Sequence, residues 1–228
     1  MPDDSAEPVP IITTVAEYAG QSTIRVSATQ LGPRYSSSDA KRIVAEWVEF
    51  LAAGPSPIRD LQFVSRTPRR LFDALAGQQQ LRRLSVKWGD YEDLSALSDL
   101  TRLTYLRLGG ASSVRNLSPL SALSGVVELE LASLRHAHDL DPIGAMQTVT
   151  SLEVAGDIWS MRIAHVDSLS FLRQMRQLRR LRLDTLVVDD LDYSPILELS
   201  NLQSLVVTRA RGMRPKFEEL VASTPWDA

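Results

Sequence analysis

The stretch Leu103–Leu131 reads LTYLRLGGASSVRNLSPLSALSGVVELEL. It contains two copies of one aliphatic spacing, 23 residues apart: Leu103, Leu106 and Leu108, then Val126, Leu129 and Leu131. A second apolar arm, residues 116–123, lies between the copies. A segment this short cannot bury its leucines alone, so it needs a similar segment on either side. The stretch therefore predicts a solenoid, in which each repeat packs on its neighbours.

The same spacing recurs along most of the chain. Its first apolar position falls at Ile58, Leu81, Leu103, Val126, Val149, Leu178 and Leu202. Each of these is followed three and five residues later by further apolar residues, such as Leu61 and Phe63. Seven copies in regular order are too many for chance, and they predict parallel strands stacked side by side.

The chain resembles leucine-rich repeat proteins from Ile58 to Arg209, and arms such as Leu-Ser-Pro-Leu at 117–120 are similar to those of the bacterial, internalin-like class. The resemblance implies an α/β fold: a curved parallel sheet with short helices or 3₁₀ turns on its convex side. It also implies a binding function, but proteins with this fold bind very different partners.

The remaining segments predict caps for the two ends of the repeat core. Residues Asp39–Ala53 place apolar side chains on one stripe at helical spacing, with Ser38 as the expected N-cap and Gly54 just beyond the end. Thr23–Ser27 alternates as a strand does. We expect four regions: a flexible tail (1–10), a capping strand and helix (11–57), the repeats (58–209) and a C-terminal cap (210–228).

The back half of each repeat carries turn signals. Pairs of a capping residue and a proline occur at Thr67-Pro68, Ser118-Pro119, Asp141-Pro142 and Ser194-Pro195. They predict short helical starts with proline in the first position. The side chains expected to accept backbone N–H groups where the chain bends are Asp93, Asn116, Asp139 and Asp190.

Composition excludes several classes of function. With 25 basic and 28 acidic residues the net charge is -3, which offers no general attraction to nucleic acid or an anionic membrane. There is no cysteine, so thiolate metal sites and disulfides are absent. The N-terminal residues lack a signal-peptide pattern, and no apolar run reaches membrane-spanning length. We expect a cytoplasmic protein, monomeric or weakly self-associating, without cofactors.

Side chains between the aliphatic positions point to the other face of the strands, the concave side of the solenoid. They form a basic patch, an acidic centre and a second basic patch, with two aromatic residues near the strand ends. Together with Trp159 of the longer repeat, they are the expected partner-binding residues: Arg83, Lys87, Trp88, Tyr105, Arg107, Glu128, Glu130, Glu153, Trp159, Arg180 and Arg182. Register places Arg107 beside Glu130 and Glu153 beside Arg182.

Two interpretations of this charged face stay open. The charges pair across strands and only keep the sheet soluble, or they form a groove complementary to a protein partner. The repeat that starts at Val149 is longer than its neighbours, with its extra residues in Gly156–Asp167. In a solenoid such insertions form loops on one face and often take part in binding.

An alternative is a small enzyme or metal-binding protein. All three histidines fall within residues 136–165, and stacking of consecutive repeats brings His138 and His165 near aspartates such as Asp167 and Asp189. Their spacing matches no known metal motif, and no catalytic or phosphate-binding motif is present. The basic run 173–182 offers a weaker, phosphate-binding alternative, which the neighbouring acidic centre opposes. A third possibility is an architectural segment that docks on another copy through an exposed end.

Overall fold

One long parallel sheet organises the molecule. The computed structural model describes residues 9–157, 160 and 162–225. Within these residues the main sheet has nine strands, all parallel and side by side in chain order. They are β1 (Ile11–Ile12), β2 (Thr23–Val26), β3 (Asp60–Thr67), β4 (Arg83–Gly89), β5 (Tyr105–Leu108), β6 (Glu128–Ala132), β7 (Ser151–Ala155), β9 (Arg180–Asp184) and β11 (Ser204–Val207). A second sheet pairs β8 (Ala164–Val166) with β10 (Leu186–Val188).

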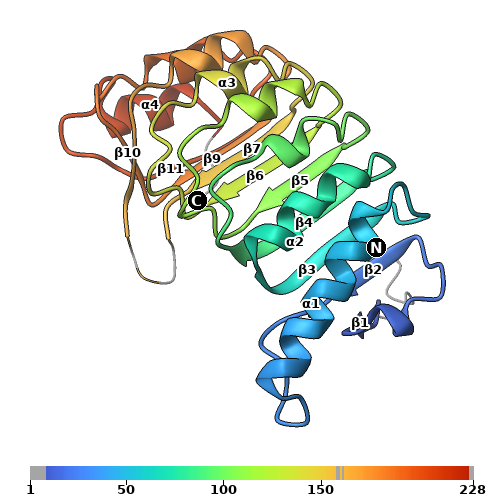
Figure 1. Ribbon diagram of the computed structural model, residues 1–228. Helices are drawn as coiled ribbons and strands as arrows, with labels where there is room; N and C mark the ends of the chain where they lie inside the picture. Colours follow the sequence, from blue (N-terminus) through green and yellow to red (C-terminus); the bar gives the residue numbers. More distant parts are fainter. Residues whose placement is uncertain (1–8, 158–159, 161, 226–228) are drawn as a thin grey trace.

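Short helices return the chain from each strand to the next. The α-helices are α1 (Ser37–Ala52), α2 (Arg69–Asp73), α3 (Asp141–Gly144) and α4 (Phe217–Ser223). The 3₁₀ turns are η1 (Val15–Glu17), η2 (Ala74–Gly77), η3 (Ser95–Leu97), η4 (Ser118–Ala122), η5 (Ser170–Gln174) and η6 (Ser194–Glu198). Figure 1 shows α1, α2 and α3 along one side of the sheet. We call the opposite side, where the side chains between the buried positions point, the open face. No helix of the described residues is long and apolar enough to cross a membrane.

The core is a ladder of aligned aliphatic side chains. Leu106 pairs in register with Leu129, and Leu129 pairs with Leu152. The same register joins Leu61, Leu84, Leu181 and Leu205, and none of these seven leucines is more than 1% exposed. The predicted stacking of repeats is therefore confirmed.

The helix α1 covers the N-terminal end of this core. It buries Ile43, Trp47 and Leu51, and the Trp47 indole N–H donates to the carbonyl of Thr13 at 2.8 Å. The expected N-cap was wrong by two residues. Ser36, rather than Ser38, accepts the Asp39 N–H at 3.1 Å, and the Asp39 carboxylate accepts the Ser36 N–H in return. These two reciprocal hydrogen bonds satisfy backbone N–H groups at the start of the helix that have no acceptor within the helix itself.

The polar turn residues behave as predicted, and the proline pairs do mark short helical starts, but the residue before each proline is not the N-cap. Oxygens of the predicted side chains accept the N–H two residues further on, at 2.8–2.9 Å: Asp93, Asn116, Asp139 and Asp190. Asp192 makes the same bond to Ser194 at 3.0 Å, which the sequence analysis missed.

Pro119, Pro142 and Pro195 occupy the second position of their turns, so the residue before each is already helical, whereas Pro68 is itself the N-cap of α2. The N-caps are Leu117, Leu140 and Tyr193, and Thr67 instead ends strand β3 with a buried hydroxyl that has no partner among the described residues.

We predict that Leu129→Ala lowers the free energy of unfolding by about 2–5 kcal/mol, because it opens a cavity between two fully packed neighbours. The measurement is urea unfolding followed by circular dichroism. Leu197→Ala is the matched control, since Leu197 is 46% exposed and we expect its loss to cost under about 1 kcal/mol. Equal effects of the two substitutions would contradict the ladder.

Candidate functional site on the open face

Two rows of side chains cross the open face in register. One row holds Asp60, Arg83, Tyr105, Glu128, Ser151, Arg180 and Ser204. The other holds Arg25, Gln62, Ser85, Arg107, Glu130, Glu153, Arg182 and Val206. The sequence analysis predicted both rows from strand alternation but did not extend them to β2, so it missed Arg25. The alternation of Thr23–Val26 was a sufficient signal, because it has the same pattern as the repeats.

A basic hollow lies at the N-terminal end of these rows. It has a volume of about 530 Å³, and its lining includes Arg25, Lys87, Trp88 and Arg107. The Nε atom of Arg25 is buried and has no hydrogen-bond partner among the described residues. Neither Arg25 nor Lys87 forms an ion pair among the described residues, so the hollow offers positive charge beyond that of Arg107, which pairs with Glu130.

Trp88 lies in this hollow, where the backbone at Gly110 approaches its side chain closely. It is 36% exposed, and the Arg66 guanidinium lies 5.8 Å from its ring centre. A Cβ atom at Gly110 would lie 2.4 Å from the Trp88 Cβ, closer than real contacts allow. The absence of a side chain at Gly110 thus leaves the room that the Cβ atom of Trp88 occupies.

The acidic centre is tied to its basic neighbours. Glu130 forms an ion pair with Arg107 at 3.1 Å and accepts a hydrogen bond from the Tyr105 hydroxyl at 2.9 Å. The Arg83 guanidinium stacks over the Tyr105 ring at 4.0 Å from its centre. Burial, together with the charge of Glu130, raises the pKa of Tyr105 to about 12. The phenol therefore stays protonated and acts as a hydrogen-bond donor at neutral pH.

Unlike Glu130, which pairs with Arg107, Glu153 has no ion-pair partner among the described residues. It lies between Glu130 and Arg182 in register, as predicted. Arg182, however, turns to Asp184 at 2.7 Å instead of to Glu153. Burial, followed by the nearby charge of Glu130, raises the pKa of the Glu153 carboxyl. The free-energy cost of partly removing this carboxylate from water is therefore only partly offset by the nearby arginines.

A second hollow surrounds this carboxylate. It has a volume of about 450 Å³ and is lined by residues of the four strands β6, β7, β9 and β11. These residues are Glu130, Ser151, Leu152, Glu153, Arg180, Leu181, Arg182, Ser204 and Val206. The open face thus carries two hollows of different charge character, one basic and one centred on an unpaired carboxylate.

The longer repeat forms a small structure of its own. Asp157 and Arg162 pair as an antiparallel bridge, and β8 follows to pair with β10. Beside it, Ile163 is 54% exposed. Trp159, a predicted partner-binding residue, lies outside the described residues.

The basic run 173–182 is divided between two sides of the molecule. Arg180 and Arg182 lie on the open face, whereas Arg173 lies within the turn η5 and pairs with Glu198 at 3.0 Å. The run therefore does not form one continuous cationic surface.

The histidine region does bring ligand-type side chains together. Ligand atoms of His138, Asp167 and Asp189 all lie within 4.8 Å of one another, and all three residues are exposed. His165 hydrogen-bonds to Asp189 and does not join this group. Asp139 and Asp190 serve as turn acceptors.

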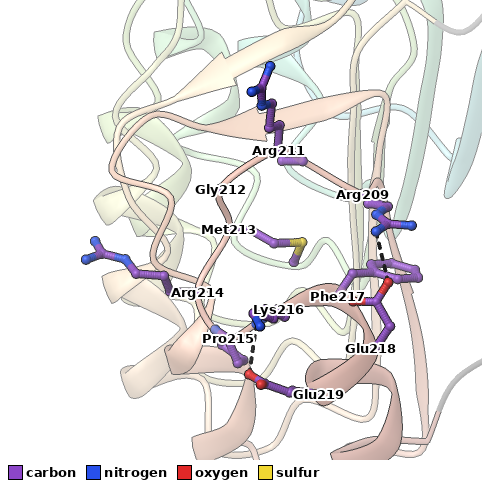
Figure 2. Close-up of a pocket in the computed structure, with 11 residues that line it drawn as sticks. Arg209, Arg211, Gly212, Met213, Arg214, Pro215, Lys216, Phe217, Glu218 and Glu219 are labelled. Carbon is purple, nitrogen blue, oxygen red and sulfur yellow. Dashed lines mark hydrogen bonds and ion pairs between the residues drawn. The ribbon is translucent and has the colours of Figure 1, made fainter.

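A large hollow near the C-terminus is a feature of one local turn. It measures about 820 Å³ and is lined only by residues 209–219, between β11 and α4. Figure 2 shows Arg211 and Arg214 pointing outward in different directions, while Arg209 pairs with Glu218 at 2.9 Å. The helix α4 begins at Phe217, after this turn. The cations of the turn do not converge, so we assign no ligand to this hollow.

Comparison with known proteins supports the fold. No protein-family model matches the chain, and no curated protein matches it. Among solved structures, an internalin of Listeria monocytogenes (inlF) is similar with a TM-score of 0.59 at 16% identity, covering 90% of this chain and 52% of the internalin. Another, internalin C2 (inlC2) of the same organism, gives 0.53 at 18% identity, covering 79% and 72%.

The chain has the fold of a leucine-rich repeat protein. This confirms the internalin-like leucine-rich repeat architecture expected from the sequence. The chain spans about half the length of the first of these internalins. At such low identities the likeness concerns the leucine-rich repeat fold alone.

We predict that Glu153→Gln changes the dependence of stability on pH. Because the pKa of Glu153 is raised in the folded leucine-rich repeat sheet, this carboxyl favours folding below its unfolded pKa, and that contribution disappears as pH rises through the folded pKa. Relative to wild type, the variant should gain stability between about pH 4 and pH 7. Melting temperatures across this range provide the measurement, with Glu128→Gln as the control on the neighbouring row. A parallel pH profile for wild type and Glu153→Gln would contradict the assignment.

Proposed function

We propose that the chain is a non-catalytic protein-interaction module that holds a protein partner on the open, concave face of its leucine-rich repeat sheet. The observation that carries this proposal is the unpaired carboxylate of Glu153. It is half-buried in a hollow of the sheet, yet its basic neighbour Arg182 pairs with Asp184. A half-buried carboxylate without an ion pair loses hydration, and a cationic group of a partner would offset that cost.

The charges of the two hollows favour a partner that carries one basic group and one acidic group at a defined distance from each other. A lysine or arginine of the partner would compensate Glu153, and an acidic group would meet Arg25 and Lys87 in the basic hollow. Five strand spacings separate β2 from β7, which amounts to roughly 24 Å along the sheet. An extended partner segment of about seven residues covers that distance. Tyr105 and Trp88 supply aromatic surface between the charged ends.

The leucine-rich repeat sheet is also suited to binding by its rigidity. The strands are held by a continuous ladder of backbone hydrogen bonds, so binding on them needs little ordering of the protein. The ion pairs on the open face join exposed arginines to partly buried carboxylates, and each contributes about 1 kcal/mol to stability. These residues are therefore free to vary for recognition without loss of the fold.

We propose the same four regions as the sequence predicts. They are a tail (1–10), a capping region (11–57), leucine-rich repeats (58–209) and a C-terminal cap (210–228). Residues 1–8 of the tail lie outside the described residues. A bacterial origin, a cytoplasmic location, and a monomeric or weakly self-associating state stay predictions, as does the participation of Trp159.

We predict that the double variant Arg107→Glu/Arg182→Glu loses its partner, with affinity reduced at least about 100-fold. Each guanidinium is about half exposed, at 51% and 45%, so we expect the folded state to lose no more than about 2 kcal/mol. The measurement is capture of proteins from an extract of the source organism, identified by mass spectrometry and followed by titration of the purified partner.

The control for this experiment is Arg176→Glu, which makes the same charge change on an exposed residue beyond the turn η5. It should bind like the wild type. Unchanged capture by the double variant would refute the open-face proposal, and unfolding of the double variant would assign the arginines to stability instead.

A further inference from the structure

We propose that His138, Asp167 and Asp189 form a binding site for a divalent first-row transition-metal ion such as Zn²⁺. The site is independent of the proposed partner-binding face. His138 lies between β6 and α3, Asp167 follows β8, and Asp189 follows β10. Three successive turns of the solenoid therefore supply one ligand each.

Stacking of the turns explains why these side chains meet. The strands β8 and β10 pair in register, so the residues that follow them lie side by side. The Asp167 N–H donates to the His138 carbonyl at 3.0 Å, which ties the third turn to the other two. The ligand atoms lie within 4.8 Å of one another. Bonds of about 2.1 Å to a tetrahedral metal place ligands roughly 3.4 Å apart, so modest side-chain rotations complete the site.

The surrounding hydrogen bonds orient the ligands as protein metal sites require. The Nδ1 of His138 lies 2.9 Å from the carbonyl oxygen of His165. A carbonyl oxygen only accepts, so this nitrogen carries the proton and Nε2 keeps its lone pair for a metal. His165 in turn contacts one oxygen of Asp189 through its Nδ1 at 2.7 Å. The second oxygen of that carboxylate is left for coordination.

The charge of the cluster also favours a cation. Two carboxylates lie within a few ångströms of each other, and no lysine or arginine of the described residues forms an ion pair with either. One imidazole nitrogen with two carboxylate oxygens suits Zn²⁺ or another first-row ion better than Mg²⁺ or Ca²⁺, which prefer oxygen ligands alone. Water would fill the remaining positions, because all three residues are exposed.

The test is calorimetric titration of the full chain, without a histidine tag and after treatment with chelator, using ZnCl₂. We expect one saturable Zn²⁺ site per chain, and MgCl₂ should give no comparable signal. His138→Ala should weaken Zn²⁺ binding by at least about tenfold, and so should Asp189→Asn, which preserves the shape of the side chain. Circular dichroism should show both variants folded, since the altered residues are exposed.

His136→Ala is the matched control, because His136 is an exposed histidine in the same segment and lies outside the cluster. It should bind Zn²⁺ as the wild type does. The proposal is overturned if the wild type shows no saturable site, or if His136→Ala loses as much affinity as His138→Ala. Equal affinity of Asp189→Asn and wild type would overturn the assigned ligands.

Discussion

The structure depends on the burial of short aliphatic triplets that no single repeat can shield from water. Each turn of about 23 residues exposes its leucines unless another turn covers them. Leu129 is fully buried because Leu106 and Leu152 lie on either side of it in register. Stability therefore arises from contacts between neighbouring turns, and the ends need covers such as α1.

The same constraint determines which side chains reach the open face. Because strand residues alternate, the positions between the leucines must point to the open face whatever their chemistry. Their charges contribute little to stability, so they are available for recognition. The turns obey a similar rule, since stacking places equivalent loop residues side by side. In this way side chains far apart in sequence, those of His138 and Asp189, come close together.

Much of the fold was predictable because its cause is local and repeated. The spacing around Leu106 and Leu129 is enough to derive the register, and from it the pairing of Arg107 with Glu130. The finer geometry was not predictable, because it depends on side-chain rotamers. Arg182 has two acidic neighbours, Glu153 and Asp184, and its rotamer in the folded protein directs the guanidinium to Asp184. Likewise, spacing did not reveal which of Ser36 and Ser38 caps the first helix.

The most direct test of the account is the distance between the methyl groups of Leu106, Leu129 and Leu152 in solution. Methyl-labelled protein and nuclear Overhauser spectroscopy provide it. Adjacent strands lie about 4.8 Å apart, so the account predicts strong contacts from Leu106 to Leu129 and from Leu129 to Leu152. Contacts between Leu106 and Leu152 should be much weaker, because another rung lies between them. Absence of the two neighbouring contacts in the folded protein would contradict the solenoid and every inference drawn from its open face.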